Sequence, residues 1–108
     1  YGYDWPLPFE RGATKAKTIG NIEAVQIAVS QGAEIKFDEL AQSPYFNYES
    51  NGILHEVWFE DARSINEKLA LAEEYNLRGF SCWQIMELFR PLWLLSADRF
   101  SIQKVPFI

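Results

Sequence analysis

The sequence predicts an α+β fold in which a small lobe, built from one helix and a three-stranded antiparallel sheet, is inserted into a partial β-α-β segment. Two observations predict this fold. Residues 33–60 alternate between apolar and polar side chains and contain Asn51-Gly52, a strong hairpin signal because both central turn positions need positive φ. Residues 64–83 hold an amphipathic helix that leads within a few positions into a short apolar run, as in half of a β-α-β unit.

The chain opens with a predicted strand over residues 1–5, which Pro6 and Pro8 end because proline cannot continue a ladder of hydrogen bonds. Residues 9–20 are predicted to form a solvated loop. This loop is locally basic, which leaves contact with an anionic polymer open as an alternative.

The lobe is predicted over residues 20–61. Asn21 is the expected cap at the start of its helix, and Gly32 is the expected residue at its end. Trp58, in the last strand of the lobe, is expected to be a core residue. The three strands are expected over residues 33–39, 44–49 and 53–60.

A second helix is predicted over residues 64–76. Ser64 and Glu67 form a reciprocal capping pattern, and Asp61 is an alternative cap. Asn76 is the expected stop, because asparagine tolerates the left-handed conformation that ends many helices. One face of this helix carries apolar residues at helical spacing: Ala62, Ile65, Leu69 and Ala72.

The remaining residues are predicted to form one more strand and a short helix. Residues 80–83 are apolar enough for a strand that is covered on both faces. Pro91 is expected in the first turn of the short helix, since proline suits that position. Residues 100–108 have the composition of a mixed tail that can end in an extended segment.

The bulk composition indicates one globular domain with a packed core, since 48% of the residues are hydrophobic and 16% are aromatic. The net charge of −5 argues against a nucleic-acid partner, which requires a basic surface. No apolar run approaches the ~20 residues of a membrane span, so no membrane partner is expected. The single cysteine, Cys82, excludes an internal disulfide, and the single histidine, His55, has no set of metal ligands around it. Neither a metal nor a cofactor is therefore expected.

Three stretches together resemble the C-terminal quarter of the family 18 glycoside hydrolases, the chitinase family. They are YGYDW at the start, WFEDARSI at the end of the lobe, and LRGFSCW after the second helix. The longer runs YGYDWPLPFERGATKAKT, AQSPYF and HEVWFEDARSI are similar to a narrower branch, the cortex-lytic N-acetylglucosaminidases of bacterial spore germination. The resemblance covers nearly the whole chain.

The resemblance implies that the chain is a single fragment of a TIM barrel that carries the family's insertion lobe. Residues 1–19 would supply barrel strand seven and its loop, residues 20–61 the lobe, and residues 62–108 helix seven, strand eight and a closing segment. Functional residues of such barrels lie at the C-terminal ends of the strands, where Trp5 and Trp83 are both expected.

The resemblance also implies which residues contact a substrate. Trp83 matches the tryptophan that lies beneath the sugar at the cleavage point, although a tryptophan that fills the barrel core is an alternative. Trp5 matches the tryptophan of a Tyr-Gly-x-x-Trp pattern, and Tyr3 stands where many members carry arginine. Asp4 is a candidate hydrogen-bond partner for a sugar hydroxyl, or a cap for the next turn.

Family 18 enzymes carry an Asp-x-x-Asp-x-Asp-x-Glu run whose glutamate protonates the leaving oxygen, while the acetamido group of the substrate itself attacks the sugar carbon. The 108 residues contain no such run, so no catalytic residue is expected and the chain alone is predicted not to hydrolyse glycosides.

Two functional hypotheses follow. The first is a fragment that contributes binding surface to a glycosidase acting on a peptidoglycan, spore-cortex or chitin-like glycan, with the spore or cell envelope as the implied location. The alternative is a non-catalytic carbohydrate-binding or protein-interaction module. The fragment hypothesis also predicts self-association through strand edges that are left exposed.

Overall fold

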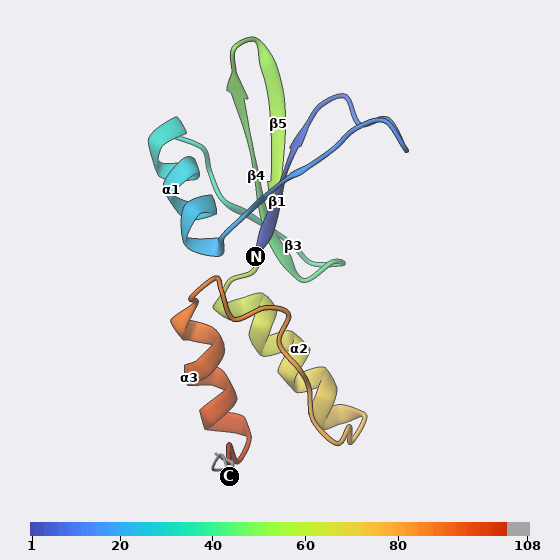
Figure 1. Cartoon of the computed structure of the whole chain (residues 1–108), viewed down its shortest axis with the longest axis vertical. Coiled ribbons are helices and arrows are strands. Elements are labelled where there is room, and N and C mark those ends of the chain that lie inside the picture. Colours follow the sequence, from blue (N-terminus) through green and yellow to red (C-terminus); the bar gives the residue numbers. More distant parts are fainter. Residues whose placement is uncertain (104–108) are drawn as a thin grey trace.

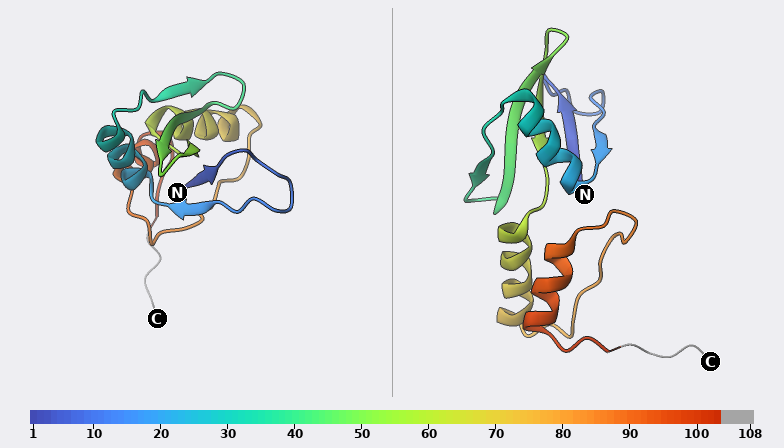
Figure 2. Two further views of the ribbon diagram at one scale, coloured as in Figure 1. Left: turned by 90° about the horizontal axis from the view of Figure 1, so that it is seen from above. Right: turned by 90° about the vertical axis from the view of Figure 1, so that its left-hand side faces the viewer.

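The computed structural model describes residues 1–103, which form five strands and three helices (Figure 1). Their order is β1 (Gly2–Pro6), β2 (Lys17–Ile19), α1 (Asn21–Gln31), β3 (Lys36–Asp38), β4 (Ser43–Ser50), β5 (Ile53–Trp58), α2 (Ala62–Glu74) and α3 (Arg90–Arg99). The strands make one sheet, α1 packs beside it, and α2 and α3 lie next to each other at one end of the sheet (Figures 1 and 2). None of the helices within residues 1–103 has the length and hydrophobicity that crossing a membrane requires.

The sheet is antiparallel throughout and has the strand order β2-β1-β5-β4-β3. The expected three-stranded sheet is present as β3, β4 and β5, but β1 extends it beside β5 and β2 extends it beyond β1. Asp4 of β1 thus lies opposite both Val57 of β5 and Lys17 of β2. The prediction of a loop throughout residues 9–20 was wrong at β2, where the pairing with β1 buries Ile19.

The predicted strand over residues 80–83 is absent, because residues 77–89 contain neither helix nor strand. The physical reason lies in β1, whose two edges are already occupied by β2 and β5. A strand needs a neighbour to satisfy its backbone N–H and C=O groups, and β1 offers no free edge to a parallel partner.

The hairpin between β4 and β5 confirms the prediction made from Asn51-Gly52. Both residues have positive φ, 52° and 77°, as a tight hairpin turn requires. The backbone at Gly2 approaches the end of β5 so closely that a Cβ atom there would lie 2.5 Å from the carbonyl oxygen of Trp58. Gly2 therefore lets β1 pack directly against the chain that leaves β5.

α1 covers one face of the sheet (Figure 2). Ala24 and Ala28 of this helix are buried in a core cluster with Phe46, Val57, Ile19 and Phe59. Gly32 ends α1 in a left-handed conformation, as predicted. The prediction that Asn21 caps α1 was wrong, because Gly20 holds that position. The Asn21 side-chain oxygen instead accepts a hydrogen bond from the Glu60 backbone N–H at 2.9 Å.

α2 begins with a capping box, but its members are not the predicted pair of Ser64 and Glu67. Asp61, the alternative, is the cap: its carboxylate accepts from the Ser64 backbone N–H at 3.0 Å, and the Ser64 hydroxyl accepts from the Asp61 N–H at 2.9 Å. Ser64 is therefore the third residue of the helix, and the prediction that it caps the helix was wrong. Ile65, Leu69 and Ala72 are buried as predicted, whereas Ala62 is exposed.

Two other predictions for the C-terminal part of the described chain are confirmed. Asn76 has a left-handed φ of 51° just beyond α2, and Pro91 lies in the first turn of α3. Arg99 joins the two helices through contacts of 3.1 Å with both Glu73 and Asn66. Residues 100–103 belong to no helix or strand, and the rest of the predicted tail, residues 104–108, lies outside the described residues.

Candidate functional site

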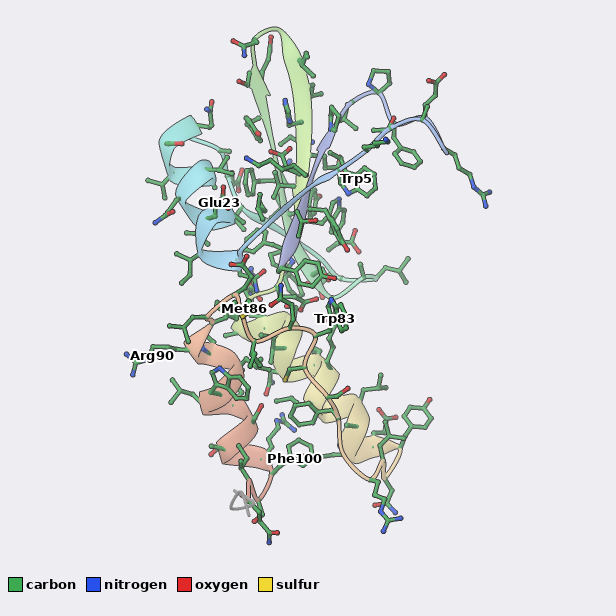
Figure 3. The ribbon with its side chains drawn as sticks, viewed as in Figure 1. Trp5, Glu23, Trp83, Met86, Arg90 and Phe100 are labelled. Carbon is green, nitrogen blue, oxygen red and sulfur yellow. The ribbon has the colours of Figure 1, made fainter. Side chains whose placement is uncertain are left out.

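A cavity of about 470 Å³ lies where the end of the sheet meets α2 and the segment 80–89. Tyr1 and Tyr3 line it from the side of the sheet, and Phe80 and Trp83 line it from the segment after α2. Figure 3 shows Trp83 next to α2, whereas Trp5 lies beside the strands, away from that helix. The cavity therefore combines two predicted site residues, Tyr3 and Trp83, and excludes Trp5 from its lining.

The aromatic wall of this cavity is open to solvent. The Trp83 side chain is 83% exposed, so it does not fill a core within the described part of the chain. The Tyr1 and Tyr3 rings meet edge to face at 5.5 Å, and the Tyr3 hydroxyl donates a hydrogen bond to the Tyr1 hydroxyl at 3.4 Å. This hydrogen bond raises the pKa of Tyr3 above its ordinary value, so the Tyr3 hydroxyl keeps its proton at neutral pH.

Tyr1 is a site residue that the sequence analysis missed. The signal for it was the spacing of two positions between Tyr1 and Tyr3, since residues i and i+2 of a strand point to the same face.

The polar wall of the cavity is organised around Glu60. One carboxylate oxygen accepts a hydrogen bond from the Ser64 hydroxyl at 2.6 Å, and the other is bonded to the Lys68 ammonium group. The Glu60 backbone N–H is bonded to Asn21. Because these contacts join the start of α1 to the first two turns of α2, Glu60 holds the polar wall of the cavity in place.

Asp4 lies on the opposite face of β1 and does not line the cavity. Its side chain is buried, and its two oxygens contact the Tyr48 hydroxyl at 2.5 Å and the His55 Nδ1 atom at 2.8 Å. The Tyr48 and His55 rings stack on each other with centroids 4.7 Å apart. Burial, together with the hydrogen bond to Asp4, raises the pKa of Tyr48 well above its ordinary value. Asp4 is therefore not placed to contact a sugar that lies in this cavity.

Trp5 lies on the face of the sheet opposite to Asp4, beside an aromatic group that the sequence analysis missed. Trp58 was expected in the core but is half-buried on this face, where its ring stacks on Tyr45 with centroids 4.5 Å apart. The core position belongs to its neighbour Val57. The alternation of side chains along β5 was the signal, because it places Trp58 and Val57 on opposite faces.

The cavity combines apolar and polar lining groups. Aromatic rings, two hydroxyls and a carboxylate–ammonium pair suit a polyol with both apolar and hydroxyl-bearing faces. Within residues 1–103, no group of three or more His, Cys, Asp or Glu side chains lies close enough together to hold a metal ion.

The chain matches no protein-family model, but it is similar to several characterised proteins. It is 45% identical over 108 residues to the cortical fragment-lytic enzyme of Bacillus subtilis (strain 168), an alignment that covers 99% of this chain and 25% of that protein. It is 32% identical over 104 residues to di-N-acetylchitobiase of Rattus norvegicus, which covers 77% of this chain and 28% of that protein.

A solved structure has the same fold. The Bacillus megaterium QM B1551 spore cortex-lytic enzyme SleL superposes with a TM-score of 0.91 and 43% identity, over 98% of this chain and 25% of that one. The chain thus spans about a quarter of the length of the curated relatives that it matches.

Proposed function

The chain is a homologue of bacterial spore cortex-lytic enzymes and has a chitinase-like, family 18 relationship, and from this premise we propose that it supplies glycan-binding surface to a glycoside hydrolase. The proposed substrate is a glycan that contains N-acetylglucosamine, such as peptidoglycan of the spore cortex. The chain is proposed to contribute no catalytic acid of its own.

The observation that carries this proposal is the cavity in which Tyr1, Tyr3 and Trp83 meet. The apolar C–H face of a pyranose ring packs on an aromatic ring, and its hydroxyls need polar partners at the edge. The cavity offers Trp83 for the first contact, and the hydroxyls of Tyr1 and Tyr3 for the second. The similarity to a cortical fragment-lytic enzyme, a spore cortex-lytic enzyme and a di-N-acetylchitobiase supports the same ligand class.

The catalytic step is proposed to need residues beyond these 108. Substrate-assisted hydrolysis requires a glutamic acid that protonates the leaving oxygen and an aspartate that supports the acetamido group. These residues stand in an Asp-x-x-Asp-x-Asp-x-Glu run, which the 108 residues lack. The chain alone is therefore proposed to bind glycan without cleaving it.

We propose that the whole protein is a TIM barrel in which this chain forms the insertion lobe and the adjoining barrel segments. Residues 1–19 would supply barrel strand seven and its loop, although within residues 1–103 β1 pairs with β2 and β5 in the sheet of the lobe. Residues 79–83, which have no strand partner among residues 1–103, would pair when the neighbouring barrel strands are present. α2 and α3 would lie on the outer surface of that barrel.

A titration with N,N′-diacetylchitobiose tests the binding function. We expect saturable NMR shift changes with a dissociation constant near ~1 mM, or about −4 kcal/mol, because only part of the sugar surface is present. Trp83→Ala should weaken binding about tenfold, and its high exposure means that the fold should be retained.

Trp93→Ala is the matched control, since Trp93 is an exposed tryptophan on α3 that does not line this cavity. Equal affinities for Trp83→Ala and the unmodified chain would refute the proposed site. Release of reducing sugar from chitin oligomers by the chain alone would refute the proposed lack of catalysis.

A binding module that acts by itself is the second candidate. The observation in its favour is that the sheet and α1 share a core of their own, with Phe46, Val57 and Ala24 fully buried. A dissociation constant near ~1 μM for a chitin oligomer would favour this candidate, because a complete site is then present within the chain.

A further inference from the structure

We propose that residues 11–17, here called the basic loop, bind the carboxylates of the short peptides that branch from a peptidoglycan strand. The inference rests on the proposed glycan-binding function and deepens it. It assigns the anionic part of the proposed substrate to a part of the chain that lies outside the cavity.

Positive charge is concentrated in the basic loop. Arg11, Lys15 and Lys17 are three of the ten lysines and arginines of the chain, whereas none of its fifteen Asp and Glu residues lies in this loop. The loop stays net positive when the preceding Glu10 is counted with it, although the whole chain has a net charge of −5. A local field of this sign raises the concentration of anions near the loop.

The three cations of the basic loop are exposed, and none of them takes part in an ion pair among residues 1–103. By contrast, Arg63, Lys68 and Arg99 each contact the carboxylate of an Asp or Glu residue. The charges of the loop are therefore not used to join parts of the described chain to each other.

The carboxylate that lies opposite the loop in the sheet is already occupied. Asp4 faces Lys17 in the register of β1 and β2. The two oxygens of the buried Asp4 side chain contact Tyr48 and His55 instead. Lys17 is thus left to interact with a carboxylate from outside the described chain.

The backbone of the basic loop has a fixed shape. The Glu10 carbonyl accepts hydrogen bonds from the backbone N–H groups of Ala13 and Thr14 at 3.0 and 2.9 Å. The Thr14 hydroxyl in turn accepts from the Glu10 N–H at 2.7 Å. Gly12 has a φ of 83°, which suits glycine. Because this turn is ordered in advance, it loses less conformational entropy when a ligand binds.

The register of β1 and β2 places the basic loop away from the cavity. Gly2 faces Ile19 and Asp4 faces Lys17, so residues 7–16 lie beyond the other end of β1 (Figure 1). Tyr3, which lines the cavity, and Pro6 are about 10 Å apart along this strand. A ligand that reaches both the cavity and the loop must therefore be a polymer of several units.

The charges select the kind of polymer. Peptidoglycan combines uncharged N-acetylated sugars with peptides whose free carboxylates recur along the strand, and arginine and lysine bind carboxylates through charge-assisted hydrogen bonds. A polymer that is anionic at every unit would be repelled by the net negative charge of the rest of the chain. An acidic glycopeptide strand is accordingly the ligand that the basic loop fits.

The test compares two ligands that differ only in charge. One is an oligomeric glycopeptide prepared from peptidoglycan, and the other is the same preparation after amidation of its carboxylates. At low salt, we expect the chain to bind the acidic form about tenfold more tightly in an NMR titration, since three exposed ion pairs each contribute little. At about 1 M salt the difference should shrink, because exposed charges are then screened.

Replacing Arg11, Lys15 and Lys17 together by glutamine should abolish the preference for the acidic form. The affinity for the amidated form should stay unchanged, because none of the three residues lines the cavity. Arg11→Gln alone should lose part of the preference. Arg11 lies outside the helices and strands, so this variant keeps the test valid if circular dichroism shows that the triple variant fails to fold.

The matched control replaces Lys36, Arg78 and Arg90 together by glutamine. These residues are exposed, do not line the cavity and take part in none of the ion pairs among residues 1–103. The control changes the net charge of the chain by the same amount as the triple variant of the basic loop. It should keep the preference for the acidic glycopeptide.

Three outcomes would overturn the inference. Equal affinity of the unmodified chain for both forms removes the role of the basic loop and leaves the proposed function intact. An equal loss of preference in the control variant assigns the attraction to the net charge of the chain. Binding of polyphosphate as tightly as the acidic glycopeptide shows a general attraction to anions. By contrast, absence of binding to both the amidated form and N,N′-diacetylchitobiose refutes the proposed function itself.

Discussion

At the scale of single residues, Asp4 shows how a buried carboxylate organises the strands around it. Its two contacts, Tyr48 on β4 and His55 on β5, tie β1 to the central hairpin from the covered face. Tyr3 and Trp5, on either side of Asp4 in the chain, point to the other face. Asp4 thus supports the strand that carries Tyr3 and Trp5, without touching the cavity that Tyr3 lines.

The Tyr48 hydroxyl makes stability depend on alkaline pH. The pKa of Tyr48 is raised in the folded chain, whereas an unfolded tyrosine ionises near pH 10. The stabilising contribution of Tyr48 is therefore complete below about pH 10 and is lost as the pH rises from there toward the folded pKa. Above about pH 10, the free energy of unfolding should fall by about 1.4 kcal/mol per pH unit more than it does in Tyr48→Phe.

Urea unfolding at several pH values between about 9 and 11 measures this difference, because the other tyrosines contribute equally to both proteins. Tyr75→Phe is the control, since Tyr75 is exposed just after α2. Parallel pH profiles for the unmodified chain and Tyr48→Phe would contradict the role assigned to this hydroxyl.

At the scale of elements, the residues at the start of α2 connect the sheet to the two helices α2 and α3. Asp61 caps the helix, and the preceding Glu60 is bonded to Asn21, Ser64 and Lys68. The same few residues therefore fix the direction of α2 and one wall of the cavity. Because the cap is local, its loss should weaken the helix without abolishing the fold.

Asp61→Ala should lower the free energy of unfolding by about 1 kcal/mol, the usual contribution of a capping side chain. Glu67→Ala is the control, because Glu67 is an exposed residue within the same helix and is also replaced by alanine. Urea unfolding measures both changes. A loss for Asp61→Ala no larger than that for Glu67→Ala would show that the capping box contributes nothing.

At the scale of the whole molecule, the apolar surface is unevenly distributed. Trp83, Ile85, Met86 and Leu88 are all exposed and follow one another within six positions of the segment after α2. Exposed apolar side chains that are concentrated in one segment favour contact with another surface. In the proposed barrel, neighbouring segments would provide that surface.

The chain alone should therefore associate with itself in a concentration-dependent way. Light scattering is expected to show a rising average mass, and a dye for apolar surfaces should bind. Replacing Ile85 and Met86 by serine should reduce both effects, whereas replacing Leu40, an exposed leucine in the β3–β4 turn, should not. A monomer at high concentration with no bound dye would contradict this prediction.

Much of the fold could be predicted because its signals are local. The Asn51-Gly52 turn, the left-handed Gly32 and Asn76, the buried face of α2 and the position of Pro91 depend on residues that are close in sequence. The homology to cortex-lytic and chitinase-like proteins was likewise readable from short runs of sequence. For the candidate site, Tyr3 and Trp83 were selected by this likeness, and the structure brings both to one cavity.

The sequence by itself determined the kinds of element, their turns and the family relationship, because each depends on short-range sterics and hydrogen bonds. Only the tertiary structure decided that β1 and β2 join the sheet of the lobe, and that residues 80–83 have no strand partner among residues 1–103. It also decided that the Asp4 carboxylate contacts Tyr48 and His55, and that the Trp58 indole N–H donates a hydrogen bond to Glu56. Strand pairing and cross-strand contacts join residues that are far apart in the chain, and their free energy depends on which edge or face is available once the other strands have paired.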